Sequence, residues 1–451
     1  MNIPLKAPIL KPLKEDIEIY DIIYIGFGPA TIFSILDNPE LYNKKVLVLE
    51  KGDSLKNRDE KEIVFGSGGA GAFSDSKLVS NPLVGGDIQN LNSISPSLFD
   101  NLADRILYYY NEFYDGDKGS FNWMPIDPYE LPSDKLKLLK SRVCHIGSDR
   151  SREVFKNIEE EISHITELKF NEEVVNFFET NFGCFEVYTN KGKYLTKKLV
   201  VGVGKRSSLV QNAIERFNLK TTPNRVQIGV RVECLNTYFK ELVDKFYDFK
   251  IVMKTKLGRW RTFCVNSSNA HVVVEKGEGF VSANGHAYSG GESTGLTNFG
   301  IMGDLDLKWS REEQLALVIK TSKGGEKSQA DICGNTLIAQ DIEAFKYRVI
   351  HIIRTPTTLS KDDWRYDNLW DYYPEEICLE LKEFIEEIQK YFPFEGHFMA
   401  PEIKLTNSLI KMSPNFEVYP GLFVIGDASS YTRSIIQAGI SGMLVGRKLS
   451  E

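Results

Sequence analysis

The chain has 451 residues, of which 42% are hydrophobic and 12% aromatic. This length exceeds what one hydrophobic core usually supports, so the sequence predicts a folded protein of two domains, or one domain interrupted by another, and excludes an intrinsically disordered chain. The formal net charge of -7 gives no electrostatic basis for nucleic-acid binding as the main task.

Cysteine spacing and hydropathy add further exclusions. The 6 cysteines are scattered, without a C-x-x-C pair or a metal-ligand spacing, so neither disulfides nor a metal site is predicted. No apolar run approaches the roughly 18 to 20 residues that span a bilayer, and no signal-like core follows the N-terminus. We therefore expect a cytoplasmic protein without a membrane partner, and a flexible leader over residues 1–20. The oligomeric state is not predicted.

The first predicted elements are a strand, a glycine turn, a helix and a second strand. The β-branched run from Asp21 to Ile25 predicts a buried parallel strand, and Gly26 and Gly28 follow it. Apolar residues at helical spacing, with Pro29 in the first turn, then predict a helix. A second buried strand is predicted over 46–49. Together these elements form a βαβ unit.

The glycine turn has an unusual third position. Gly26 and Gly28 would let the backbone approach a pyrophosphate at the helix N-terminus, where free N–H groups favour an anion. Thr31 stands where a third glycine normally lets the helix pack close to the strand, so we expect relaxed packing there. Glu50, roughly 20 residues further on, is expected to accept hydrogen bonds from ribose hydroxyls. The alternative is a tight structural turn followed by a surface glutamate.

A glycine-rich segment, "VFGSGGAGAFSDSKL" from Val64 to Leu78, comes next. Its small residues would let a backbone lie flat against a planar ring, and the alternative is a flexible loop. Helices are predicted through "LFDNLADRILYYYNEF" and over residues 148–164. Three strand-like segments follow, and the last ends in "VVGVG", as a strand returning to the parallel sheet would.

From about residue 221 the pattern alternates, which predicts an antiparallel sheet with one solvated face. Arg231 and Glu233 would share a face of one strand, as a surface ion pair rather than a substrate clamp. Residues 322–331 are predicted to be an exposed loop, and residues 375–392 a helix. A last buried strand, a Gly-Asp turn and a closing helix end the chain.

The C-terminal strand and turn distinguish between dinucleotides. "GLFVIGD" ends at Asp427, whose carboxylate can hold the ribitol hydroxyls of a flavin nucleotide, and the helix from about Ser434 would aim its N-terminus at the flavin ring. Enzymes that bind only NAD have no need of this second element, so FAD is favoured. No second complete G-x-G-x-x-G follows a strand, so NAD(P)H or another electron donor would dock transiently, or the substrate itself would reduce the flavin.

Six segments spread over nearly the whole chain resemble bacterial FAD-dependent dehydrogenases, which belong to the glutathione-reductase-like and aromatic-hydroxylase-type flavoproteins. They are "YIGFGPA", "GSGGAGAFSDSKL", "HIGSD", "IGVRVE", "APEIK" and "GLFVIGDASSYTRSIIQAGISG". The resemblance implies an α/β fold with a discontinuous, Rossmann-like FAD-binding domain over residues 21–215 and 400–451. It also implies an inserted α+β substrate domain, with a mainly antiparallel sheet, over residues 216–399.

The resemblance also implies roles for individual residues. The pyrophosphate would contact Gly26, Gly28, Ala30 and Thr31, and the adenosine ribose Glu50 and Lys51. Val174 would offer backbone groups to adenine, and Gly204 would lie near the dinucleotide. The flavin half would be lined by Asp427, Arg433, Ser434, Ile435 and Gln437. Gly71 belongs to the glycine-rich segment at the ring, and Lys77 or Arg433 would stabilise negative charge on the reduced flavin.

The catalytic acid or base is not identified by the sequence. The candidates are His145, His271, His286 and Lys404, although a lone histidine is more often structural. Where many members of the family have a "CMCPGG"-like turn, this chain has "CVNSSN" from Cys264, which leaves the substrate open.

The leading interpretation is an FAD-dependent oxidoreductase that transfers a hydride between flavin and a small organic substrate bound between the two domains. One alternative is a flavin monooxygenase that uses transiently docked NAD(P)H and oxygen. A second alternative is an FAD-binding protein that interacts with a partner or RNA and turns over little.

Overall fold

The computed structural model describes residues 18–58, 65–74, 76–92, 94–204, 207–276, 279–287, 292–323, 335–350 and 356–451. These residues divide into two compact units. Unit 1 comprises the described parts of Met1–Met124, Arg142–Thr221 and Leu409–Glu451, and unit 2 those of Pro125–Ser141 and Thr222–Ser408. Within the described ranges, no helix is both long and apolar enough to cross a membrane.

The limits of the units differ from the predicted domain limits. The expected limits at 215/216 and 399/400 fall at 221/222 and 408/409. Residues 125–141 lie in unit 2 because β4 (Leu136–Leu138) pairs with β12 (Ile251–Lys254). Residues 1–17 of the expected leader lie outside the described residues, and its last two residues belong to β1 (Ile19–Ile25). Assigning FAD to one unit and substrate to the other stays a prediction.

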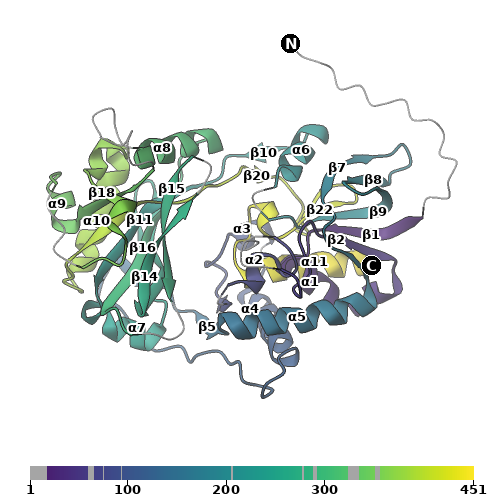
Figure 1. Cartoon of the computed structure of the whole chain (residues 1–451), viewed down its shortest axis with the longest axis horizontal. Coiled ribbons are helices and arrows are strands. Elements are labelled where there is room, and N and C mark those ends of the chain that lie inside the picture. Colours follow the sequence, from purple (N-terminus) through teal and green to yellow (C-terminus); the bar gives the residue numbers. More distant parts are fainter. Residues whose placement is uncertain are drawn as a thin grey trace, which may run out of the picture. The chain divides into compact units, whose positions relative to one another are not determined.

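Unit 1 is built on a largely parallel sheet with the strand order β21-β22-β9-β1-β2-β6. Figure 1 labels β22, β9, β1 and β2 of this sheet. All neighbours except the antiparallel β21–β22 pair run parallel. The bounds are β2 (Val46–Leu49), β6 (Glu167–Lys169), β9 (Lys193–Val201), β21 (Glu417–Tyr419) and β22 (Leu422–Val424). The hairpin of β7 (Val174–Glu179) and β8 (Phe185–Thr189) pairs antiparallel with the first half of β9. The near-continuous apolar runs of β1 and β2 suit strands that are covered on both faces.

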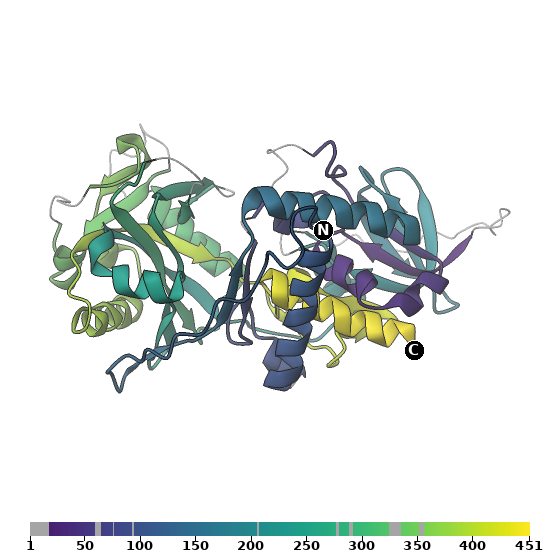
Figure 2. The ribbon, with the colours of Figure 1, turned by 90° about the horizontal axis from the view of Figure 1, so that it is seen from below.

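Helices cover one face of this sheet, and the β7–β8 hairpin with α6 (Leu209–Arg216) covers the other. The first group comprises α1 (Pro29–Leu36), α4 (Pro96–Glu112), α5 (Ser148–Ile165) and α11 (Ile435–Ser450). Figure 2 shows α11, in yellow, beside α4. The backbones of α1 and α11 approach closely at Gly442. A Cβ added there would lie only 1.8 Å from the Ala30 carbonyl oxygen.

Unit 2 contains an 8-stranded sheet of order β18-β17-β19-β11-β16-β13-β12-β4, antiparallel except for the β17–β18 pair. The bounds are β11 (Val226–Leu235), β13 (Gly258–Ser268), β16 (Leu296–Leu305), β17 (Leu337–Asp341), β18 (Trp364–Tyr366) and β19 (Gly396–Lys404). One face packs against α10 (Glu375–Gln389) and α7 (Lys240–Phe246). The hairpin of β14 (Ala270–Lys276) and β15 (Val281–Ala287) packs against the other face. The predicted fold class, a parallel α/β sheet with a second, mainly antiparallel sheet, is confirmed.

Two local predictions need correction. Ser322 and Lys323 were expected in a loop, but they end α8 (Arg311–Lys323), where the Ser322 hydroxyl donates to the Val318 carbonyl at 2.9 Å. The rest of that expected loop, residues 324–331, lies outside the described residues. The helix expected over 375–392 ends at Gln389, because Lys390 already forms its C-cap.

Candidate functional site

Four neighbouring parallel strands of unit 1 end at the same level. Ile25 pairs with Leu49 on one side and with Val201 on the other, and Val201 pairs with Val424. The residues that follow the strands therefore line one edge of the sheet, namely Gly26, Glu50, Gly202 and Ile425, with Gly426 one position further on. In open parallel sheets ligands bind at this carboxyl edge.

The two glycines of the first turn are required for different reasons. Gly26 has φ +94°, and a Cβ there would lie 2.6 Å from the Gly202 carbonyl oxygen, so the fold itself demands glycine. Gly28 has an ordinary φ of -93° and is the N-cap of α1, without any side-chain cap. No atom of the described chain lies within 4 Å of the Cβ that a larger residue would carry at position 28. The space beside Gly28 is therefore open at an uncapped helix N-terminus.

The glycine-rich segment packs directly against this turn. The Gly68 N–H donates to the Phe27 carbonyl at 2.8 Å, and a Cβ at Gly69 would lie 3.3 Å from the Gly28 Cα. A Cβ at Gly71 would meet the Pro29 ring at 2.9 Å. The segment includes a single helical turn, α2 (Gly69–Ala72), rather than being only a loop. Its glycines make room for close packing, so Gly71 has a structural reason of its own.

Glu50 holds three segments of the site together. Its Oε2 accepts from the Phe27 N–H at 2.9 Å, and its Oε1 accepts from the N–H groups of Gly52 and Gly66, each at 2.9 Å. The side chain is buried. A carboxylate offers about four acceptor positions, so three bonds leave one position on Oε2. The expected bond to a ribose hydroxyl is compatible with this remainder, but the glutamate is in the first place structural and is not on the surface.

Replacing Glu50 by alanine will therefore destabilise unit 1. Three backbone N–H groups of a buried turn lose their acceptor, and we expect the free energy of unfolding to fall by about 2 to 4 kcal/mol. Urea denaturation of the purified protein measures this loss. Glu40, an exposed residue, provides the control, because alanine at Glu40 should change the free energy by less than about 0.5 kcal/mol. Equal stabilities of the two variants would contradict the assigned role.

The relaxed packing expected at Thr31 is not present. Thr31 is wholly buried, and the close approach that a third glycine would provide comes instead from Gly202 at the end of β9. A Cβ at Gly202 would lie 3.0 Å from the Thr31 Oγ1, closer than side chains normally pack. The glycine that allows the close approach thus follows the neighbouring strand β9 and does not lie in helix α1.

The second helix N-terminus at this edge belongs to α11. Gly426 has φ +61° and donates its N–H to the Ser441 Oγ at 3.0 Å, which fixes the turn that carries the partly exposed Asp427. Ser434 is the N-cap of α11 and accepts from the Gln437 N–H at 3.1 Å, and Ile435 opens the helix.

Sequence reasoning missed a segment that packs on this N-terminus. We call residues Pro82–Asp87 the strap. Gln437 donates through Nε2 to the Pro82 and Val84 carbonyls at 3.0 and 2.8 Å, and the Arg433 N–H donates to the Gly85 carbonyl at 2.6 Å. The sequence signal for this segment was the pair of consecutive glycines at 85 and 86, which indicates a tight turn. Both glycines have positive φ in the structure.

The remaining predicted cofactor residues of unit 1 lie at varied positions. Lys51 is exposed, with its Nζ 4.6 Å from the centroid of the Phe65 ring. Val174 is buried at the start of β7. Gly204 has φ +69°, and no described atom lies near the position of its missing Cβ. Lys77 begins β3 (Lys77–Ser80) and stands opposite His145 of β5 (Arg142–His145), so one catalytic candidate adjoins the glycine-rich segment.

The other catalytic candidates belong to unit 2. His271 and His286 are cross-strand partners in the β14–β15 hairpin, and the His271 Nε2 lies 3.3 Å from the Asn269 Oδ1. Lys404 ends β19 opposite Gln227. Unit 1 thus contains only His145 of the four candidates. The positions of these four residues assign a catalytic role to none of them.

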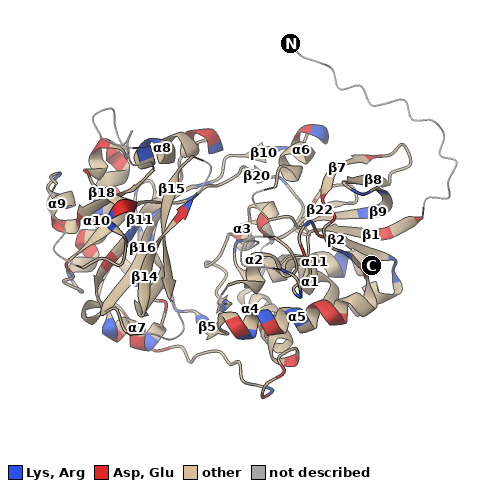
Figure 3. Cartoon of the chain, in the orientation of Figure 1, with Lys and Arg blue, Asp and Glu red and all other residues tan. Residues whose placement is uncertain are grey.

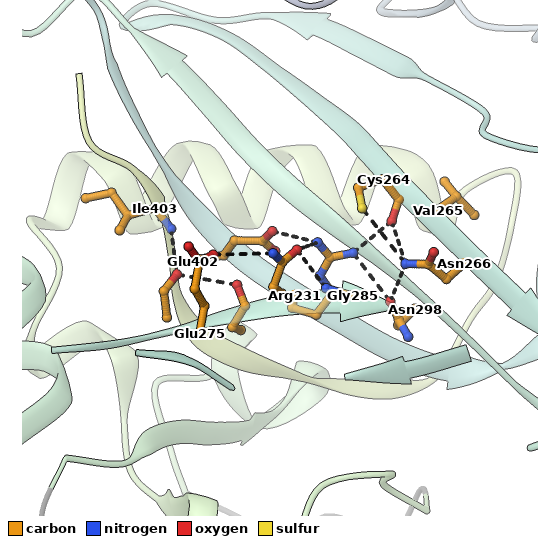
Figure 4. A network of polar contacts seen from close by, with 12 residues as sticks. Arg231, Cys264, Val265, Asn266, Glu275, Gly285, Asn298, Glu402 and Ile403 are labelled. Atoms are coloured by element: carbon orange, nitrogen blue, oxygen red, sulfur yellow. Dashed lines mark hydrogen bonds and ion pairs between the residues drawn. The ribbon is translucent and has the colours of Figure 1, made fainter. Parts of the chain in front are cut away.

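Arg231 and Glu233 do not form the surface ion pair that the sequence predicted. Both are wholly buried, because the β14–β15 hairpin covers their face of the sheet. Arg231 pairs instead with the buried Glu402 at 2.6 Å (Figure 4), and Glu233 lies 3.2 Å from the His397 Nε2. Burial alone would raise the pKa of Glu233, but hydrogen bonds from His397 and Thr358 lower it below its usual value. The alternating pattern of the strand correctly predicted that Arg231 and Glu233 share a face. It wrongly predicted that this face is exposed.

Among the residues that the structure describes, no group of three or more His, Cys, Asp or Glu side chains is arranged to hold a metal ion.

No protein-family model matches the chain. An uncharacterized protein of Clostridium beijerinckii is 22% identical over 98% of this chain and 83% of its own length. Among solved structures, CtdE in complex with FAD is 12% identical, with 96% of this chain and 85% of that chain covered and a TM-score of 0.38. The myxobacterial FAD-dependent halogenase CndH is 13% identical over 96% and 75% of the chains, with a TM-score of 0.40. A geranylgeranyl bacteriochlorophyll reductase-like protein of Thermoplasma acidophilum is 13% identical over 96% and 78%, with a TM-score of 0.39. At such TM-scores the similarities establish no function for this chain.

Proposed function

We propose that unit 1 binds FAD at the carboxyl edge of its parallel sheet and that the protein is an FAD-dependent oxidoreductase. The observation that carries the proposal is the open space at Gly28, at the uncapped N-terminus of α1. This space lies at the edge of the sheet where the neighbouring strands β2, β9 and β22 also end. A helix N-terminus with room for close backbone approach suits a pyrophosphate.

Unpartnered polar atoms support the fit of a larger ligand at the second helix. The Thr432 Oγ1 and the Gln437 Oε1 are buried and have no hydrogen-bond partner among the described residues. Buried polar atoms are rarely left without a partner, so these two favour a ligand or water at this position. They lie at the N-terminus of α11, where the resemblance expects the flavin half of the dinucleotide.

Each part of the edge then has a distinct task. The turn from Gly26 to Thr31 binds the pyrophosphate, and the remaining acceptor position of Glu50 takes a ribose hydroxyl, with Lys51 beside it. Val174 offers backbone groups to adenine, and Gly204 lies near the dinucleotide. Around the flavin half lie Gly71, Lys77, Asp427, Arg433, Ser434, Ile435 and Gln437. When bound, FAD supplies the capacity to accept or donate a hydride equivalent.

The charges of the chain fit a small-molecule substrate better than RNA. On α5 (Figure 3), the basic Arg150 lies between Asp149 and Glu153, and the second half of the helix carries the acidic run 159–161, so its exposed face has no basic stripe. Nucleic-acid binding draws mainly on clustered positive charge. We infer that the substrate is a small organic molecule and that NAD(P)H or another donor delivers electrons.

Anaerobic reduction of the purified protein tests the proposal. The protein should be yellow or become so with added FAD, and its absorbance near 450 nm, a general property of oxidised flavins, should fall when a nicotinamide or an organic substrate is added. Bleaching by NADH or NADPH identifies a reductase or, if oxygen is consumed only with substrate present, a monooxygenase. Bleaching by an organic substrate alone identifies a dehydrogenase. Failure to bind FAD would overturn the proposal.

A further inference from the structure

The β14–β15 hairpin lies on the large sheet of unit 2 without joining it. Among the described residues, β14 and β15 pair only with each other, as a separate 2-stranded sheet. The apolar contact beneath the hairpin is small and comprises Val272, Val281 and Ala283 of the hairpin with Leu337, Ala339 and Met399 of the large sheet. The apolar core on the opposite face of the sheet is far larger. Apolar burial therefore holds the hairpin less strongly than it holds the rest of the unit.

Charged and polar side chains fill the layer between the hairpin and the sheet. This charged layer consists of Arg231, Glu233, Asn298, His397 and Glu402, which lie on the neighbouring strands β11, β16 and β19 and are wholly buried. The hairpin backbone rests directly on the layer (Figure 4). A Cβ at Gly285 would lie 2.4 Å from the Asn298 Oδ1 and 2.6 Å from the Arg231 Nη1. The hairpin thus covers groups that water would otherwise solvate.

The closed hairpin leaves part of the charged layer without hydrogen bonds. The atoms of the layer that have no partner among the described residues are the Arg231 Nε, the Asn298 Nδ2, the His397 Nδ1 and the Glu402 Oε2. Each of these atoms has lost its hydration without gaining a partner, which costs free energy. Burial also raises the pKa of the Glu402 carboxyl, although Arg231 opposes the rise. Opening the hairpin would return all four groups to water.

Side-chain hydroxyls, rather than a strand ladder, fasten the hairpin to its surroundings. The Val272 N–H donates to the Thr358 Oγ1 at 2.9 Å, and the Ile403 N–H donates to the Ser282 Oγ at 3.3 Å. A hydroxyl and a backbone N–H can each take water as a partner when they separate, so breaking such bonds costs little.

Both ends of the hairpin carry a residue in the left-handed conformation. Ser268, two residues before β14, has φ +68°, and Gly295, which lies after β15, has φ +71°. The Thr294 N–H donates to the Ser268 carbonyl at 2.8 Å, which holds the two ends side by side. No described atom lies within 4 Å of the Cβ that a larger residue would carry at position 295. The geometry at this point suits a hinge, since hinges are a few residues at the ends of elements that absorb changes of φ and ψ.

We propose that the β14–β15 hairpin is a lid, which opens as a unit about Ser268 and Gly295 and gives water and small polar molecules access to the charged layer beneath it. The structure holds the lid in its closed position. Because the hairpin, the hinge and the charged layer all belong to unit 2, the inference stands whether or not unit 1 binds FAD.

Thiols placed on the two sides of the closed contact report the opening. S282C puts a thiol on the buried side of the hairpin, and A339C puts one on the sheet beneath it. Native Cys234, wholly buried on the opposite face of the same sheet, is the internal control. N-ethylmaleimide should alkylate both introduced thiols at least about 100-fold faster than Cys234, because Cys234 becomes accessible only on global unfolding. Site-resolved mass spectrometry measures the rates.

The urea dependence of these rates separates lid opening from unfolding. Low concentrations of urea should accelerate alkylation of Cys234 steeply and that of the introduced thiols only slightly, since opening the lid exposes much less surface than unfolding the chain.

Two neighbouring valines of β14 provide matched variants. Val272 is buried against the sheet, whereas Val273 is partly exposed. In the A339C protein, V272A should raise the alkylation rate of the introduced thiol about ten-fold, a difference of about 1.4 kcal/mol, because it weakens the contact that keeps the lid closed. V273A should change the rate less than about two-fold, as surface substitutions usually do.

Three results would overturn the proposal. If both introduced thiols react as slowly as Cys234, the hairpin stays closed and trapped water must satisfy the unpartnered atoms. If S282C reacts and A339C stays protected, the hairpin frays alone and does not open as a unit. Equal effects of V272A and V273A would show that the contact with the sheet does not control access. Circular dichroism checks that each variant folds. Should A339C fail to fold, S282C decides, and a urea dependence as steep as that of Cys234 contradicts the lid.

Discussion

Replacing Gly442 by alanine will destabilise unit 1 by about 3 kcal/mol or more. The added methyl would lie 1.8 Å from the Ala30 carbonyl oxygen and 3.1 Å from the Ser34 nitrogen, both backbone atoms of α1, so α1 and α11 must move apart. Overpacking a tight contact usually costs about 1 to 3 kcal/mol, and backbone atoms cannot rotate away as side chains do. The loss must also exceed the gain of about 1 kcal/mol that alanine brings to a helix interior. Urea denaturation measures the total.

Gly439 on the same helix provides the comparison. A methyl there would meet only the ends of side chains, the Ile106 Cδ1 at 2.7 Å and the Phe33 Cδ2 at 2.8 Å, which can shift. The G439A variant should therefore lose clearly less stability than G442A. Hydrogen exchange should be faster in peptides from α1 and α11 of G442A, and not in peptides of unit 2. A G442A protein as stable as the unsubstituted chain would show that these helices pack less closely than described.

The elements of the nucleotide-type site that lie near one another in sequence could be predicted. The order strand, Gly26, Gly28, helix, strand and Glu50 covers a single βαβ unit, and local propensity with the glycine spacing fixes it. What spacing could not reveal is that Glu50 turns inward to three backbone N–H groups. That depends on Gly66 returning to the turn, which is a matter of tertiary packing.

Contacts between distant segments were beyond sequence reasoning. Gln437 donates to Pro82 across 355 positions, and consecutive glycines at 85 and 86 indicate a tight turn without indicating its partner. The close approach of Gly202 to Thr31 likewise joins segments that are far apart in the sequence. In unit 2, alternation placed Arg231 and Glu233 on one face, but only the fold of the β14–β15 hairpin decides whether that face meets water. Burial by another element has no local signal.

Replacing Gly28 by valine will abolish tight FAD binding while the chain still folds. The valine Cβ would enter the open space beside the N-terminus of α1, and the φ of -93° at this position is allowed for any residue. A pyrophosphate and a branched side chain cannot both occupy that space, so we expect the affinity for FAD to fall at least about 100-fold, or about 2.7 kcal/mol. Fluorescence titration of the flavin-free protein with FAD measures the affinity.

Stability separates this effect from misfolding. Valine is a poorer N-cap than glycine, so the unfolding free energy of flavin-free G28V should fall by at most about 1 kcal/mol. Gly192, in the turn between β8 and β9, is the matched control, because it too has an ordinary φ and no described atom near its missing Cβ. G192V should bind FAD normally. If G28V also bound FAD normally, the open space at Gly28 would have no ligand to explain it. A loss in both variants would mean that valine acts through the fold and not through the space at Gly28.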